Sequence, residues 1–328
     1  MAEDIKLMLS KIRPYNEETD SNLEKFSHSK LECFDHCPRN FMLKYRYNNY
    51  LGIDSVATAV GSIVHKVLEL KGICKMEKKE VDYEYLKEVL MNGYKDNEEN
   101  LIGINKIKIE FRDEWEEFDT KSLLTYDEKI QVFLDSVLTN EMEDEEWEVI
   151  GTEVPFSFVY DNKYVIRGFC DRIDAKRDND GNIIDIKCVD YKSSRTVFQR
   201  SKIVSSQQFG IYSMAIYLMY GMLPSEHEYS FVLIDEKQSN KDGVCTSGYI
   251  KRILKKIDKL FESIEEMDST GCFKPNANQL CHWCDFCEHS VNGQEPYNTY
   301  CDYYSLWTPY NRTFAVNKEY SPEDDMEI

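Results

Sequence analysis

The stretch IIDIKCVDYK, residues 183–192, decides how the rest of the chain is interpreted. Residues 183–189 are mostly apolar and follow the turn sequence DNDGN, so they predict a β-strand. The strand ends on Asp190, and Lys192 comes two residues later. Because side chains alternate between the two faces of a strand, Asp190 and Lys192 are expected to point the same way. One Asp-x-Lys triplet carries little weight in a chain that is 30% charged, so its surroundings decide its meaning.

The elements expected around this strand follow the order α-β-β-β-α-β. Each is recognised by apolar residues at helical spacing or in period-two alternation. The set comprises a helix at 57–71, strands at 147–160, 164–174 and 183–189, a helix at 203–220, a strand at 229–234 and a further helix at 248–267. This order predicts a mixed α/β fold in which the three consecutive strands form a meander.

Three of these elements carry residues that can bind a cation. Asp171 and Asp190 are expected at adjacent strand positions of the meander, and His65 faces the core side of the first helix. Carboxylates together with an imidazole can hold a hard divalent cation, and Lys192 beside them can orient a water and stabilise developing negative charge. These residue types predict metal-assisted hydrolysis of a phosphodiester. Asp174 is the alternative to Asp171.

Four short motifs also occur in a fixed order along the chain. They are GSIVH at 61–65, GFCDR at 168–172, DYK at 190–192 and QFGIY at 208–212. In this order they resemble the GxxxH, GxxDR, D-x-K and Q-xxx-Y motifs of the PD-(D/E)XK nuclease superfamily, in its RecB/AddB-like branch. That branch includes CRISPR-associated adaptation nucleases and phage relatives. The resemblance runs from about residue 29 to about residue 290 and implies a restriction-endonuclease-like fold.

The resemblance implies a metal site that binds Mg²⁺ or Mn²⁺. It makes His65, Asp171 and Asp190 the ligands, and an imidazole ligand suits Mn²⁺ better than Mg²⁺. Arg172 sets the register of the GxxDR motif, which favours Asp171 because the ligand directly precedes the arginine. Glu153 resembles an acid of the preceding strand and is expected only to support the ligands.

The resemblance also implies catalytic roles for three further residues. Lys192 corresponds to the lysine that reaches the attacked phosphate or its water. Gln208 and Tyr212 lie four residues apart on one helix face and correspond to a motif that positions the lysine or the DNA strand. The alternatives are a salt bridge for Lys192 and an ordinary amphipathic helix for Gln208 and Tyr212.

The segment CHWCDFC, residues 281–287, is the second strong signal. Its C-x₂-C-x₂-C spacing lets Cys281, Cys284 and Cys287 converge on one site, as in iron–sulfur ligation. By resemblance to cluster-containing members of the branch, the fourth ligand is Cys37, which precedes Pro38 and Arg39. Pro38 suits the first turn of a helix, with Cys37 at its N-cap. The expected cofactor is a [4Fe-4S] cluster.

Other ligand sets remain open for these cysteines. In the family the last two cysteines are further apart than Cys284 and Cys287, so Cys301 could take the place of Cys287, and Cys33 could take that of Cys37. Zinc is the alternative metal, with His282 or His289 as a ligand. The other cysteines are expected to be buried packing residues.

The domain boundaries expected from the sequence divide the chain into three parts. Residues 1–28 form an N-terminal arm, and residues 29–290 form the nuclease domain. That domain contains a helical insertion at about 73–140 and the cysteine cluster at 281–287, joined to Cys37. Residues 291–328 form a C-terminal extension with an acidic tail.

The net charge of −20 opposes broad non-specific binding to nucleic acid. Basic clusters at 192–202 and 251–259 nevertheless allow a local basic groove, or simply solvated helix faces. No apolar run approaches the ~18 residues of a membrane span, and no secretory signal is present, so a cytoplasmic protein without membrane contact is expected.

The function expected is a metal-dependent DNA nuclease, most simply an exonuclease acting on DNA ends or single strands in recombination, repair or phage DNA metabolism. The chain has no GxxxxGK[ST] motif and hence no built-in ATP motor, so a separate helicase or recombinase is a possible partner. One alternative is a non-catalytic DNA-end or protein-interaction module of the same fold. An RNA nuclease is another.

Overall fold

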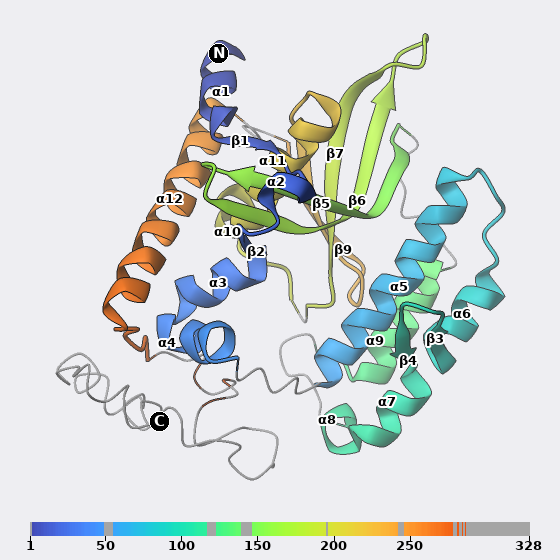
Figure 1. Cartoon of the computed structure of the whole chain (residues 1–328). Coiled ribbons are helices and arrows are strands. Elements are labelled where there is room, and N and C mark those ends of the chain that lie inside the picture. The colour runs from blue at the N-terminus through green and yellow to red at the C-terminus, as the bar shows by residue number, and fades with distance from the viewer. Residues whose placement is uncertain are drawn as a thin grey trace. The chain divides into compact units, whose positions relative to one another are not determined.

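The computed structural model of the chain (Figure 1) describes residues 2–48, 55–116, 123–138, 146–194, 196–241, 246–277, 281, 284 and 286. The chain divides into two compact units. The first comprises Met1–Lys25 and Asp54–Ile253, and the second comprises Phe26–Ile53 and Leu254–Ile328. The sheet and the predicted catalytic residues belong to the first unit. The cysteines considered as cluster ligands that the structure describes, Cys33, Cys37, Cys281 and Cys284, belong to the second.

A mixed sheet forms the centre of the first unit. Its main path runs β1 (Ile12–Pro14), β5 (Glu148–Tyr160), β6 (Tyr164–Arg177), β7 (Ile183–Lys192), β8 (Glu226–Phe231) and β9 (Glu236–Asn240), and β2 (Glu24–Phe26) pairs with β6. The predicted meander is confirmed, because β5, β6 and β7 pair antiparallel in turn. Strand β8 then adds parallel to β7. The mixed α/β class with an α-β-β-β-α-β core is therefore confirmed.

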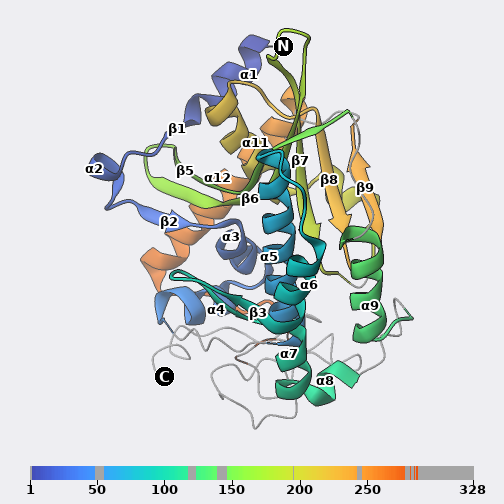
Figure 2. The same ribbon diagram turned by 90° about the vertical axis from the view of Figure 1, so that its right-hand side faces the viewer.

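Helices cover both faces of this sheet (Figure 2). On one face α5 (Val56–Met76) buries Val64 and Val67 in a core that includes Val189 and Tyr191 of β7. On the other face, Phe209 of α11 (Gln207–Tyr220) stacks on His227 of β8 at a ring distance of 4.5 Å. Both faces are buried, which explains why every residue of β8 is buried.

The predicted insertion between α5 and β5 is largely helical where it is described. Its helices are α6 (Tyr83–Asn92), α7 (Ile104–Glu110), α8 (Arg112–Glu116) and α9 (Tyr126–Phe133), the last continued by the π-helical turn η3 (Leu134–Leu138). It also contains a short antiparallel hairpin, β3 (Gly93–Lys95) with β4 (Asn100–Ile102), which the sequence pattern did not predict. Ahead of β1 lie α1 (Ala2–Met8) and η1 (Leu9–Lys11), and α2 (Glu17–Asp20) follows it.

One sequence prediction about this unit is wrong in detail, and a further strand was missed. The helix expected at 203–220 is broken into α10 (Arg200–Val204) and α11, because Ser206 caps α11 by accepting a hydrogen bond from the Phe209 amide. Strand β9 was not predicted, because its sequence EKQSN lacks an apolar alternation. Such polar sequences are tolerated in a strand at the edge of a sheet.

The second unit is helical where it is described. It contains α3 (His28–His36), α4 (Pro38–Phe41), the π-helical turn η2 (Met42–Arg46) and most of α12 (Ser247–Thr270), the helix predicted at 248–267. Cys37 is the N-cap of α4 and Pro38 occupies its first turn, as predicted. An edge-to-face contact between Phe26 and Phe261 holds the unit together, with ring centroids 5.0 Å apart. Among the described residues, no helix has the length and apolar character needed to cross a bilayer.

Candidate metal and catalytic site

The candidate site lies where β6 separates from β7. The ladder between these strands runs only as far as the pair Arg172 and Val189, whereas β7 continues beside β8 up to Lys192. At the point of separation the Tyr191 amide donates a hydrogen bond to Asp171 Oδ2 at 2.8 Å. The Asp171 carboxylate is therefore fixed by the backbone of the neighbouring strand.

Strand β5 is distorted at the same level. Its register with β6 shifts between Val149 and Gly151, and Glu153 has a φ of 44°, in the left-handed region that side chains other than glycine rarely adopt. A residue held in this conformation within a strand is strained, and such strain is concentrated at functional sites. The distortion places the Glu153 carboxylate next to His65 rather than in the regular alternation of the strand.

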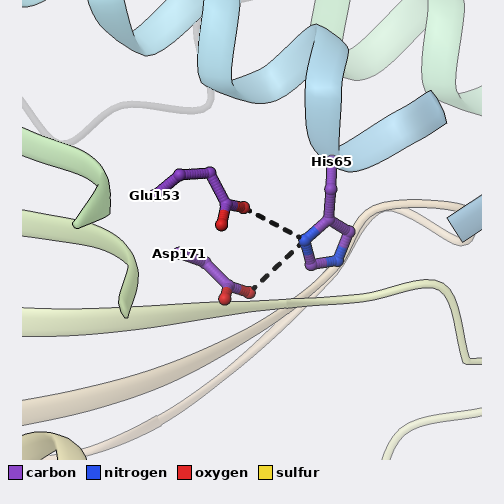
Figure 3. Close-up of side chains that lie close together, drawn as sticks. All are labelled: His65, Glu153 and Asp171. Atoms are coloured by element: carbon purple, nitrogen blue, oxygen red, sulfur yellow. Dashed lines mark ion pairs between the residues drawn. The ribbon is translucent and has the colours of Figure 1, made fainter. Parts of the chain in front are cut away.

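His65, Glu153 and Asp171 form one compact group of possible metal ligands (Figure 3). His65 Nδ1 lies 3.5 Å from Glu153 Oε1 and 3.7 Å from Asp171 Oδ2. One ligand atom from each residue lies within 4.8 Å of the others. Two carboxylate oxygens and an imidazole nitrogen fit Mg²⁺ or Mn²⁺, so this part of the site could hold the cation.

Asp190 belongs to a second, adjoining set of contacts. Its Oδ2 lies 2.6 Å from Lys192 Nζ, and its Oδ1 accepts a hydrogen bond from Gln208 Nε2 at 2.5 Å. Lys192 also donates to Gln208 Oε1 at 3.2 Å, and Gln208 Nε2 reaches the hydroxyl of Tyr212 at 2.9 Å. The four residues thus form a continuous chain in which Gln208 fixes both members of the Asp-x-Lys pair.

The charges of the metal-ligand group are not balanced. Burial and the neighbouring Asp190 raise the pKa of Asp171 to about 7, although His65 acts in the opposite direction. Burial alone would lower the pKa of His65, but the hydrogen bond with Glu153 and the charges of Asp171, Glu153 and Asp190 raise it to about 9. Without a cation, His65 is therefore the positive charge that compensates the carboxylates. A divalent cation could replace it.

Asp174, the alternative ligand, takes a different position. Its carboxylate lies 2.9 Å from Arg172 Nε and 3.3 Å from Lys187 Nζ. Arg172 also donates to the Tyr191 hydroxyl at 2.9 Å. Asp174 is thus enclosed by cations and absent from the metal-ligand group of the described residues, which agrees with the preference for Asp171.

The structure brings Glu153 closer to the proposed ligands than the sequence indicates. A period-two pattern gives no sign that the residue adopts a left-handed conformation, so it was expected only to support the ligands. The nearest signal in the sequence is Gly151, which accompanies the shift in register; a Cβ atom at this position would lie 2.4 Å from Val154.

The cysteines of the second unit are only partly described. Asn40 links two of them, because it accepts a hydrogen bond from Cys33 Sγ at 3.3 Å and donates one to Cys284 Sγ at 3.2 Å. Cys37 Sγ instead accepts the Asn276 amide at 3.4 Å. Cys33 is therefore linked to Cys284 through Asn40, whereas Cys37 contacts the chain ahead of the C-terminal cysteine segment. The predicted ligand Cys287 and the alternatives Cys301, His282 and His289 lie outside the described residues.

Comparison with known proteins agrees with this geometry. The sequence model of the PD-(D/E)XK nuclease superfamily matches residues 25–289, which is most of the chain. A search of curated proteins finds no match. The matched region contains every residue of the metal-ligand group and all four residues linked by contacts, Asp190, Lys192, Gln208 and Tyr212. The chain belongs to the PD-(D/E)XK nuclease superfamily.

Proposed function

We propose that this protein is a Mg²⁺- or Mn²⁺-dependent deoxyribonuclease of the RecB/AddB-like branch that acts on DNA ends or single strands. Superfamily membership suggests a metal-dependent nuclease that binds DNA. The observation that carries the proposal is the junction of two sets of residues: the His65–Glu153–Asp171 group and the contacts among Asp190, Lys192 and Gln208. A module that only binds DNA has no need for both.

The residues of this junction divide the chemistry between them. A divalent cation held by His65, Glu153 and Asp171, with Asp190 as a further predicted ligand, would supply a Lewis acid for hydrolysis of a phosphodiester. Lys192 keeps its ammonium group in place through Asp190 and Gln208, so its remaining hydrogen can be donated to a phosphate oxygen or to the attacking water.

Tyr212 is a neutral positioning group in this scheme. Burial, followed by the charges of Asp190 and Asp171, raises the pKa of its phenol, so it stays protonated at neutral pH. Its hydroxyl can then hold the Gln208 amide, which in turn orients Lys192 and Asp190. The role proposed for Gln208 and Tyr212 is therefore to fix the lysine.

The test is cleavage of end-labelled DNA by anaerobically purified protein. Linear and circular, single- and double-stranded DNA, with RNA of the same sequence, are incubated with Mn²⁺, Mg²⁺ or excess EDTA. DNA cleavage that requires the cation and is lost in Lys192→Ala is expected. Lys176→Ala is the matched control, because this β6 lysine pairs with Glu146 instead. Metal-dependent binding of DNA without any cleavage would instead support the non-catalytic module, and cleavage restricted to RNA would change the substrate.

We also propose that the second unit carries a [4Fe-4S] cluster held by Cys37, Cys281, Cys284 and Cys287. The contacts of Asn40 with Cys33 and Cys284 support a shared site for the two cysteine segments. They also keep Cys33 in consideration as the fourth ligand. A cluster that joins segments over 240 positions apart closes a long loop and stabilises the fold.

Anaerobic protein should be brown and contain about four irons per chain, the number held in a cubane cluster. Cys37→Ser should bleach it and lower its melting temperature, and Cys74→Ser is the control outside the site. Retained colour in Cys37→Ser with loss in Cys33→Ser or Cys301→Ser would reassign the fourth ligand. Colourless protein with one zinc would favour the zinc alternative.

We further propose a domain division, a partner and a cellular setting for this protein. Residues 29–290 are proposed as the nuclease domain, with residues 1–28 as an arm and residues 291–328 as an extension. Because the chain lacks the motif of an ATP motor, a separate helicase or recombinase is proposed as its partner in the cytoplasm, in recombination, repair or phage DNA metabolism.

A further inference from the structure

A large pocket opens beside the candidate metal site. Its volume is about 790 Å³, and His65 and Glu153 line it directly. The rest of its wall comes from α5, from the β3–β4 hairpin, and from Phe169 and Ser193, which are close in sequence to Asp171 and Lys192. The pocket therefore begins at the proposed cation and extends toward the hairpin of the insertion.

The wall formed by the hairpin and α5 is strongly acidic. The acidic wall consists of Glu69, Asp96, Glu98 and Glu99. Among the described residues that line the pocket, Lys66 is the one lysine, and it is already paired with Glu69 and, at 2.5 Å, with Glu99. The wall therefore keeps a net negative charge.

The hairpin also holds this charge in a fixed place. Asp96 Oδ1 accepts the amides of Glu98 at 2.8 Å and Glu99 at 2.7 Å, and its Oδ2 accepts the Tyr94 hydroxyl at 3.0 Å. The turn thus fixes the Asp96 carboxylate, and the ion pairs of Lys66 fix those of Glu69 and Glu99. The Lys66 ammonium group also lies 5.0 Å from the centre of the Tyr94 ring, on one face of it.

Fixed carboxylates discriminate between the parts of a nucleic acid. A phosphate that entered the pocket would be repelled, because like charges a few ångströms apart oppose each other even near the protein surface. A terminal nucleoside carries no such charge, and its hydroxyl and amino groups can donate hydrogen bonds to carboxylates. Phe169, which is 57% exposed at the pocket, offers a ring on which a base can stack.

We propose that this pocket receives the terminal nucleoside of a DNA strand, and that the acidic wall rejects a strand that continues past the scissile bond. This inference rests on the proposed nuclease function and specifies it further, because it makes the enzyme act at ends rather than within a chain. It also predicts that the end held in the pocket bears a hydroxyl group instead of a phosphate.

The test compares a linear single strand with a closed circle of the same sequence. The native enzyme should cut the circle at least about tenfold more slowly, and a terminal phosphate on the attacked end should slow the linear substrate similarly. The triple variant D96N/E98Q/E99Q should raise the circle-to-linear ratio about tenfold, since it removes the charge and keeps the turn-forming oxygen of residue 96. Higher salt should narrow the difference in the native enzyme, because exposed charges are screened.

The matched control is D82N/E84Q/E88Q on α6. It changes the net charge by the same amount and keeps a capping oxygen at residue 82, but these residues line a different surface. Its circle-to-linear ratio should equal that of the native enzyme. Equal cleavage of circle and linear strand by the native enzyme, or an unchanged ratio in the triple variant, would overturn the inference and leave the nuclease function standing. No cleavage of any substrate would overturn both.

Discussion

Two buried aspartates on strand β6, three residues apart, have opposite surroundings. Asp174 is 2% exposed and lies between Arg172 and Lys187. Asp171 is 8% exposed and faces Glu153 and Asp190 as well as His65. Asp174 therefore has two cationic neighbours, whereas Asp171 has two carboxylate neighbours and a single imidazole.

The difference shows how one strand serves both stability and chemistry. A buried charge is costly unless it is paired, so an ion-paired group such as Asp174 with Arg172 and Lys187 is a structural element. An excess of carboxylates is instead an arrangement that a cation can complete, and perturbed carboxyl groups of this kind mark functional sites. The separation of β6 from β7 lies between the two regions.

The largest effect is expected from a substitution in the ion-paired group around Asp174. Asp174→Asn should destabilise the protein by about 3–5 kcal/mol, because it leaves Arg172 and Lys187 buried without their carboxylate. Denaturant unfolding of the variant measures this change. A stability equal to that of the native protein would show that the ion-pair group is not structural.

In the carboxylate-rich region around Asp171, a substitution should lower activity and leave stability intact. Asp190→Asn should lower the rate of cleavage by about 10²–10³, equivalent to about 2.7–4 kcal/mol of transition-state stabilisation. Its unfolding midpoint should not fall, because the substitution removes a negative charge beside Asp171. The same two measurements serve both variants. A stable and fully active Asp190→Asn protein would exclude this carboxylate from the site.

Removal of the imidazole should have a smaller effect. His65→Ala should weaken the apparent affinity for Mn²⁺ at least about tenfold, because the variant loses a proposed metal ligand. It should also reduce the preference for Mn²⁺ over Mg²⁺, since an imidazole ligand favours Mn²⁺. Titration of cleavage with each metal measures both. Glu153→Gln should weaken both metals alike. If His65→Ala leaves both titrations unchanged, the histidine does not bind the cation.

The smallest effect is the release of protons when the cation binds. His65 has a pKa of about 9 without a metal, so near pH 7.5 it is protonated and must lose this proton to become a ligand. Metal affinity should therefore rise with pH up to about pH 9, by up to about tenfold per unit for one proton displaced. Calorimetry in buffers of different ionisation enthalpy counts the protons, and equal heats in all buffers would contradict this exchange.

Much of the fold follows from local pattern. The strands at 147–160, 164–174 and 183–189 were predictable because clear turn sequences separate three apolar segments from one another. They appear as β5, β6 and β7. The polar strand β9 and the short β3 and β4 were missed, since their residues carry no apolar alternation and pair only because a neighbouring strand is present.

The candidate site was predictable to the extent that it depends on spacing. The pairing of Asp190 with Lys192 follows from positions two apart on a strand, and the contact of Gln208 with Tyr212 follows from positions four apart on a helix. Two features lie largely beyond such reasoning. The left-handed backbone of Glu153 and the early end of the ladder between β6 and β7 arise from tertiary pairing, and Gly151 is the nearest sequence signal for the first of them.

The hydrogen bond from the Tyr191 amide to Asp171 gives the molecule a natural spectroscopic reporter. The oxygen that accepts this bond is the one that faces His65. A cation drawing electron density from that carboxylate weakens it as an acceptor, which shifts the Tyr191 amide resonance toward lower proton frequency and speeds its exchange with solvent. In isotope-labelled protein, a single backbone amide signal in the nuclear magnetic resonance spectrum would then record whether the site holds Mg²⁺, without substrate.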